Sequence, residues 1–153
     1  MQKVAPPPAP FCRCRAEFLA LKVRNLRSAP LICLIFYNFY ISDITNGIPE
    51  VQKPRIKDSG VSEFFSGIFL SEDIGYAKPD ERFFEECFKR IDGFQKEESI
   101  IVGDSLSSDI QGGINAGILT CHFNPKSNPY NKIKPDYKIS DLSELIPLLD
   151  SIK

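Results

Sequence analysis

The feature that most constrains the fold is a short apolar run at residues 99–102 (SIIV), which leads directly into Gly103 and Asp104. Such a run, bounded by turn residues, is typical of a strand that is buried on both faces, as strands are in a parallel sheet. Parallel strands need long crossover connections, which are usually helices. The run therefore predicts an α/β fold with helices against the sheet.

Strand-like and helix-like segments alternate along the rest of the chain. Strands are expected at 31–44, 99–102, 120–123 and 137–139, with a further apolar stretch within 64–70. Helices are expected from the Asn-Gly turn toward residue 59, and at 80–91, 109–116 and from 141 onward, where Asp141 or Ser140 would cap the last one. The helix at 80–91 has one apolar face, formed by Phe83, Phe84, Cys87, Phe88 and Ile91. We predict an open parallel, Rossmann-like sheet flanked by helices.

The first 30 residues differ from the rest. Four prolines within residues 6–10 disfavour helix and ladder pairing, and residues 15–27 could form one amphipathic helix without a recognisable cap. Residues 1–44 carry six Lys/Arg and two Asp/Glu, whereas residues 45–153 carry thirteen and eighteen. We therefore expect residues 1–30 to be a poorly ordered or extraneous arm, and residues 31–153 to be a partial core domain.

Composition excludes several classes of partner. The formal net charge of −1 gives no reason to expect nucleic acid or an acidic membrane. The longest apolar run, 31–41, is too short to cross a bilayer, which needs about 20 residues. The five cysteines have no repeated spacing, so reduced thiols in a cytoplasmic protein are a better interpretation than a zinc site.

Two polar clusters follow apolar stretches, and ligands of open α/β sheets bind at strand ends. Thr45, Asn46 and Gly47 offer a hydroxyl and backbone amides that can donate hydrogen bonds to a phosphate. The alternative is a plain turn, because Asn-Gly is a common turn dipeptide. Lys78 stands before Pro79, at a rigid helix start that could hold its ammonium near a phosphate or carboxylate. The alternative is a solvated surface lysine.

The third cluster contains two acids, Asp104 directly after the buried run and Asp109 five residues later. Two carboxylates that face one point repel each other unless a divalent cation neutralises them, and hard oxygen ligands favour Mg²⁺. The alternative is that Asp109 is only an acidic residue favoured by the dipole at a helix N-terminus. We expect a Mg²⁺ site.

Three segments in this order resemble the second, third and fourth motifs of the haloacid dehalogenase superfamily. They are ITNG (44–47), YAKPD (76–80) and IIVGDSLSSDIQGGINAG (100–117). The wider segments SEDIGYAKPDERFFEECFKRI and NAGILTCHFNP are similar to the bacterial pyrimidine 5′-nucleotidase branch, and the resemblance runs from residue 44 to the C-terminus. It implies Mg²⁺-dependent hydrolysis of a phosphate ester, here a nucleotide, through an aspartyl-phosphate.

The resemblance also implies roles for individual residues. The phosphate-binding residues would be Thr45, Asn46, Gly47 and Lys78, with backbone groups of Asn46 and Gly47 assisting, and the metal-binding residues would be Asp104 and Asp109. Lys78 would offset charge on the phosphoryl oxygens, and Asp104 would ligate Mg²⁺, so these two are the candidate catalytic residues. Asp109 would position the metal or its waters, and Ser105 would orient its neighbours.

The first motif of the family, DxDx[TV], does not occur in this sequence. The acids before Thr45 are Glu17 and Asp43, and Asp43 lies on the same expected strand as Thr45. The helical cap between the first two motifs is also missing, so we expect a sheet truncated at its N-terminus, without a central strand, and a chain inactive by itself. The alternatives are a non-catalytic remnant that binds phosphate or Mg²⁺, or a truncated gene product without function.

Overall fold

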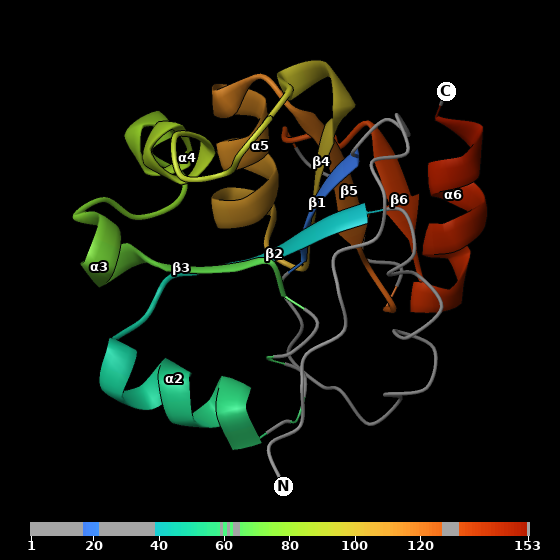
Figure 1. Cartoon of the computed structure of the whole chain (residues 1–153). Coiled ribbons are helices and arrows are strands. Elements are labelled where there is room, and N and C mark those ends of the chain that lie inside the picture. Colours follow the sequence, from blue (N-terminus) through green and yellow to red (C-terminus); the bar gives the residue numbers. More distant parts are fainter. Residues whose placement is uncertain are drawn as a thin grey trace, which may run out of the picture.

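The computed structural model describes residues 17–21, 39–58, 60, 62, 65–126 and 132–152, with the backbone alone at 17–21 and 39–40. The described strands form one sheet in the order β3-β2-β1-β4-β5-β6, and every neighbouring pair is parallel (Figure 1). The strands are β1 (Glu17–Leu21), β2 (Phe39–Thr45), β3 (Gly67–Leu70), β4 (Ser99–Gly103), β5 (Leu119–Phe123) and β6 (Tyr137–Ile139). The predicted parallel α/β fold is confirmed.

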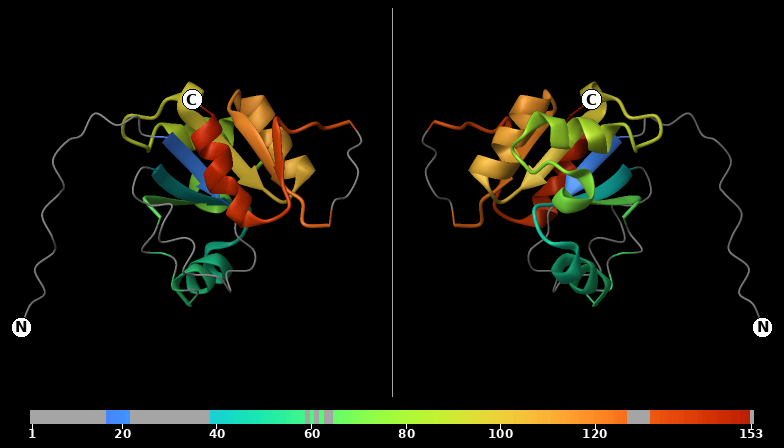
Figure 2. Two further views of the ribbon diagram at one scale, coloured as in Figure 1. Left: turned by 90° about the vertical axis from the view of Figure 1, so that its right-hand side faces the viewer. Right: turned by 90° about the vertical axis from the view of Figure 1, so that its left-hand side faces the viewer.

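Helices lie on both faces of the sheet. The α-helices are α2 (Pro49–Asp58), α3 (Ser71–Ile74), α4 (Glu81–Phe88), α5 (Gln111–Ala116) and α6 (Leu145–Ser151), and the single turns are η2 (Lys96–Glu98), η3 (Leu106–Ile110) and η4 (Leu142–Glu144). Figure 2 shows α4 and α5 on one face and α6 on the other. Helix α2 has no buried residue. None of the described helices combines the length and the apolar character that a membrane span requires.

Strand β1 corrects two expectations for the N-terminal region. Residues Glu17–Leu21 form a strand and not part of a helix over 15–27, and they occupy the centre of the sheet that was expected to be missing. Leu19 pairs with Ile41 of β2 and with Ile100 of β4. The physical reason is that β2 and β4 would otherwise each have an unpaired edge at the sheet centre. The other residues of the predicted arm lie outside the described part, so the division at residue 30 stays a prediction.

Local boundaries differ modestly from the sequence-based ones. Strand β2 is described from Phe39, and residues 31–38 of the strand expected at 31–44 lie outside the described residues. The helix expected at 109–116 begins earlier, with the π-helical turn η3 before α5. Of the two predicted caps, Asp141 and Ser140, it is Asp141 that caps the closing segment, through a reciprocal capping box with Glu144. Hydrogen bonds from Ser143 lower the pKa of Asp141.

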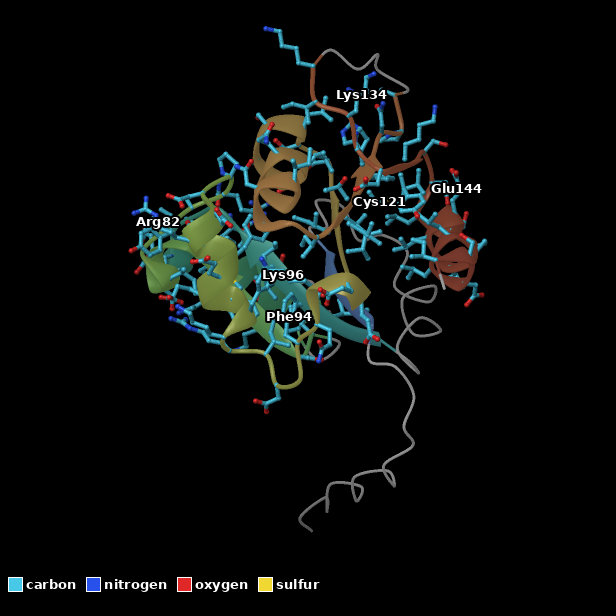
Figure 3. The ribbon with its side chains drawn as sticks, turned by 90° about the horizontal axis from the view of Figure 1, so that it is seen from above. Arg82, Phe94, Lys96, Cys121, Lys134 and Glu144 are labelled. Atoms are coloured by element: carbon cyan, nitrogen blue, oxygen red, sulfur yellow. The ribbon has the colours of Figure 1, made fainter. Side chains whose placement is uncertain are left out.

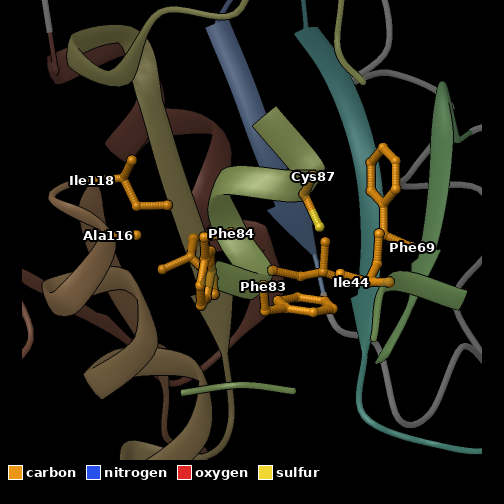
Figure 4. Packing of buried hydrophobic residues seen from close by; sticks show 9 residues of the cluster. Ile44, Phe69, Phe83, Phe84, Cys87, Ala116 and Ile118 are labelled. Carbon is orange, nitrogen blue, oxygen red and sulfur yellow. The ribbon is translucent and has the colours of Figure 1, made fainter. Parts of the chain in front are cut away.

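One hydrophobic core lies between the sheet and α4 and α5 (Figure 4). The predicted apolar face of α4 is confirmed, since Phe83, Phe84 and Cys87 are all buried and Phe88 and Ile91 pack against the cluster. The rings of Phe83 and Phe84 meet edge to face, with centroids 5.5 Å apart. This packing holds the start of α4, and with it the loop that carries Lys78, against the sheet.

A second core lies on the opposite face, under α6. Ile100 and Val102 of β4 belong to this core, whereas Ile101 belongs to the first one, as the alternation of side chains along a strand requires. Leu145 and Leu149 of α6 are buried against it. Strand β4 is buried along its whole length, which confirms the prediction made for residues 99–102.

We predict that Gly113→Ala destabilises the fold by about 1–3 kcal/mol, the usual cost of overpacking a core. A Cβ at this position would lie 2.5 Å from Ile101 Cγ2 and 2.8 Å from Thr120 Cγ2, so helix α5 could not keep its distance from the sheet. Urea unfolding of the whole chain measures the effect. The control is Ile114→Ala on the next, 45% exposed position, for which a change within about 0.5 kcal/mol is expected. Equal costs for both variants would contradict the prediction.

Candidate functional site

Lys78 lies in the loop between α3 and α4, and its ammonium joins two strand ends. The side chain is fully buried, and Nζ donates to the Ile44 carbonyl of β2 at 2.5 Å and lies 2.8 Å from Asp109 Oδ1. β2 and β4 are separated by β1, so their ends are roughly 10 Å apart. The ammonium therefore spans the carboxyl end of β1, between the expected phosphate-binding cluster and the acidic cluster. A solvated surface lysine is excluded.

Asn46 holds the backbone of the same lysine. Its Oδ1 accepts from the Lys78 N–H at 2.9 Å, and its Nδ2 donates to the Lys78 carbonyl at 2.9 Å. Thr45, which ends β2 just before Asn46, is 6% exposed. Gly47 donates its N–H to Ser71 Oγ at 3.2 Å. The backbone amide of Gly47, expected to assist phosphate binding, is thus directed to α3 in this structure.

Asp109 is held over the end of β4 by the turn that precedes α5. It is completely buried, and its Oδ2 accepts from the Ser105 N–H at 3.1 Å. Gly103 makes this approach possible, because a Cβ there would overlap the Asp109 carboxyl group. Ser105 Oγ accepts from the Ser108 N–H at 3.3 Å and so caps the turn. The glycine in the GDxxxxD pattern is thereby explained by close packing.

Asp104 follows β4 directly and is half-buried. The Nε2 of His122 lies 3.3 Å from its carbonyl oxygen, and His122 is itself 5% exposed on β5. Sequence reasoning missed His122 as a neighbour of the site. The signal that could have found it is the parallel register, since Gly103 pairs with His122 and the carboxyl ends of β4 and β5 lie side by side.

The lysine loop is also supported from α5, by residues that sequence reasoning did not assign. Asn115 donates Nδ2 to the Pro79 carbonyl at 2.9 Å, and the Lys78–Pro79 peptide bond is cis. A Cβ on Gly112 would lie 2.6 Å from the Phe84 ring, so the glycine lets α5 and α4 approach each other. Asp80 caps α4 by accepting from the Arg82 N–H, and hydrogen bonds from Arg82 lower the pKa of Asp80.

Asp104 is the acid of the site that best fits Mg²⁺, and the role of Asp109 toward the metal stays a prediction. Both oxygens of Asp109 have protein partners, Lys78 Nζ for Oδ1 and the Ser105 N–H for Oδ2. Among the described residues, no group of three or more His, Cys, Asp or Glu side chains is placed to hold a metal ion. Mg²⁺ commonly binds through one or two carboxylates together with water and substrate phosphates, and Asp104 at a strand end fits that mode.

No acid capable of acting as the family nucleophile accompanies the site in the part of the chain that the structure describes. Glu17 begins β1 and so lies at the opposite edge of the sheet from the carboxyl ends. Asp43 lies within β2, is 8% exposed and pairs in register with Ile68. In the sheet, β1 lies between β2, which ends at Thr45, and β4, which precedes Asp104. The sequence of β1 is EFLAL, which contains no aspartate.

The described thiols are poor nucleophiles. Burial raises the pKa of Cys87 to about 12 and that of Cys121 to about 12, so both are protonated at neutral pH. Cys121 lies in the interior on β5, beside α6, whereas Arg82 lies at the periphery on α4 (Figure 3). We exclude both cysteines from the chemistry of the site.

The parallel sheet, with lysine, threonine and aspartates gathered at the carboxyl ends of its strands, agrees with the resemblance to the haloacid dehalogenase superfamily. Residues 38–123 match the family model described as haloacid dehalogenase-like hydrolase. The chain belongs to this family.

Two curated relatives and one solved structure place it within the family. It is 44% identical to the HAD-hydrolase YfnB of Bacillus subtilis over 115 residues, which are 74% of this chain and 48% of that protein. It is 39% identical to the pyrimidine 5′-nucleotidase PynA of Streptococcus pneumoniae, again over 74% of this chain and 48% of the relative. The crystal structure of YfnB bound to magnesium superposes with a TM-score of 0.77 at 41% identity, covering 80% of this chain and 54% of that one. The chain spans about half the length of these relatives.

We predict that Lys78→Met destabilises the chain by about 3–5 kcal/mol, because it leaves the Asp109 carboxylate buried without its cation. Replacing both charges, in Lys78→Met with Asp109→Asn, is expected to cost less than the single substitution, since no buried charge remains. Urea unfolding of the two variants against the parent chain tests this. A double variant less stable than Lys78→Met would show that the pair is not the source of the cost.

Proposed function

We propose that this chain carries the phosphate-binding half of a phosphomonoesterase site. The observation that carries the proposal is the buried Lys78 ammonium, which lies between the end of β2 and the Asp109 carboxylate. A phosphate bound at this edge would accept hydrogen bonds from the Thr45 hydroxyl, the Asn46 backbone amide and the ammonium. Fixed donors of this kind favour a group whose negative charge grows during reaction.

The complete site would act on a pyrimidine nucleoside 5′-monophosphate. The relatives PynA of Streptococcus pneumoniae and YjjG of Escherichia coli are pyrimidine 5′-nucleotidases, at 39% and 35% identity. Matches of 115 and 113 residues within a chain of 153 residues necessarily span Lys78 and Asp104, which would bind the phosphate end of such a substrate. A cytoplasmic setting agrees with the free thiols of Cys87 and Cys121.

Mg²⁺ would be held by Asp104. Asp109 would fix the turn that follows Asp104, because its carboxylate accepts a hydrogen bond from the Ser105 N–H. When bound, the ion would shield negative charge on the phosphoryl oxygens. The contribution of this chain would be the Asp104 carboxylate at the end of β4, with His122 against the Asp104 backbone, and the Lys78 ammonium held by Asp109.

This chain by itself would bind the phosphoryl group without transferring it. An aspartyl-phosphate requires a carboxylate in line with the phosphorus, and the sequence has no aspartate before Asp43. A non-catalytic module that binds phosphate or Mg²⁺ is therefore the second candidate function. The lack of an aspartate before Asp43 favours it, because the residues proposed to bind the anion, Thr45, Asn46 and Lys78, do not include a nucleophile.

Inorganic phosphate should bind to the chain in a ³¹P NMR or calorimetric titration. The double variant Lys78→Met with Asp109→Asn should bind about 10-fold to 100-fold more weakly, which is the value of one hydrogen bond to a charged group. Lys89→Met with Glu86→Gln is the control, because it also removes one positive and one negative charge, here from the exposed pair at the C-terminal end of α4. Equal phosphate affinity in the double variant and the parent chain would refute the proposal.

We expect no hydrolysis of nucleoside 5′-monophosphates by this chain above the background of Asp104→Asn, with or without Mg²⁺. A release assay for inorganic phosphate over a panel of pyrimidine and purine monophosphates measures this. Turnover that requires Mg²⁺ and disappears in Asp104→Asn would show an active enzyme and would overturn the second candidate function.

A further inference from the structure

Lys78 is held at both of its ends by two residues of the same strand end. Its ammonium donates to the carbonyl of Ile44, and its backbone pairs with the side chain of Asn46, two residues further along. The contacts are 32 to 34 residues apart in sequence, so they fix the α3–α4 loop to the end of β2. These hydrogen bonds close a ring that consists of the backbone from Ile44 to Asn46, the Asn46 side chain and Lys78 from its backbone to its ammonium.

The Asn46 side chain both donates a hydrogen bond to the Lys78 backbone and accepts one from it, which few side chains can do. A primary amide has a donor and an acceptor on one planar group, and here both are used on one residue, at 2.9 Å each. Aspartate would lack the donor, and serine would reach only one of the two backbone atoms. The pairing therefore depends on the amide and not merely on a polar residue at this position.

We infer that Asn46 is a positioning residue that acts through Lys78, and that its side chain is not itself a phosphate ligand. The inference rests on the proposed function and refines the role of Asn46 within it. A side chain with its oxygen and nitrogen engaged by the Lys78 backbone contributes by fixing where the ammonium lies. A shift of the loop by a fraction of a hydrogen-bond length would move Nζ relative to Asp109, which it meets at 2.8 Å.

The other support of this loop provides a matched control. Asn115 also donates an amide hydrogen to a loop carbonyl, that of Pro79, at 2.9 Å, but it does so from α5 and touches the residue after the lysine. Both asparagines are exposed side chains bonded to the same loop. Asn115→Ala therefore removes a comparable bond without releasing the Lys78 peptide from the end of β2.

The first test does not depend on phosphate. Hydrogen exchange of the Lys78 backbone amide is measured by NMR in the parent chain, in Asn46→Ala and in Asn115→Ala, relative to the amide of Ile101 in buried strand β4. We expect exchange at Lys78 to accelerate at least about 10-fold in Asn46→Ala, because the acceptor of its N–H is removed. It should change less than about 2-fold in Asn115→Ala. An unchanged rate in Asn46→Ala would overturn the inference.

The second test separates positioning from direct contact by a double-mutant cycle. Asn46→Ala should weaken the binding of inorganic phosphate about 5-fold or more in the parent chain. In the background of Lys78→Met with Asp109→Asn it should weaken binding less than about 2-fold, because there is no ammonium left to position. Equal weakening in both backgrounds would make Asn46 a direct ligand and would overturn the inference. Absence of phosphate binding in the parent chain would refute the proposed function instead, and the exchange measurement would then decide the role of Asn46.

Discussion

The buried ion pair between Lys78 and Asp109 is the interaction on which the rest of the site depends. Two buried charges lose their hydration, and this cost is offset only when protein groups replace the lost hydrogen bonds to water. Here the Ile44 carbonyl serves the ammonium, and the Ser105 N–H serves the carboxylate. Each of these partners is a backbone group at a strand or turn end. The pair therefore fixes the relative position of three chain segments that are remote in sequence.

The hydrophobic core and the site are built from the same contacts. Phe84 packs against Gly112 of α5, and a Cβ on that glycine would also lie 3.4 Å from the Cα of Pro79, the residue directly after the lysine. Gly103 lets the Asp109 carboxyl group approach the end of β4, where any side chain would displace it. A substitution that changes the spacing of α4 and α5 will therefore also move the charged groups, so stability and the proposed phosphate binding should change together in this region.

The centre of the sheet shows that a fold position and its chemistry are separable. Residues Glu17–Leu21 complete the ladder between β2 and β4, because backbone groups of any sequence can pair in this way. The family resemblance places an aspartate at the end of that strand, and EFLAL has none. Backbone pairing can thus restore the architecture of the sheet without restoring a nucleophile.

The sequence by itself determined the class of fold, and it singled out Lys78 and Asp109, which the structure brings together. The buried run at 99–102, the apolar face of α4 and a cap at Asp141 or Ser140 could all be predicted, because each depends on local pattern and on burial. Only the tertiary structure decided that Asn46 pairs with Lys78, that Asp109 is engaged by the ammonium and that His122 lies beside Asp104. It also placed Glu17–Leu21 at the sheet centre, although that segment reads locally as a helix. These features are contacts between segments far apart in the chain, and such contacts leave no periodic signal in the sequence.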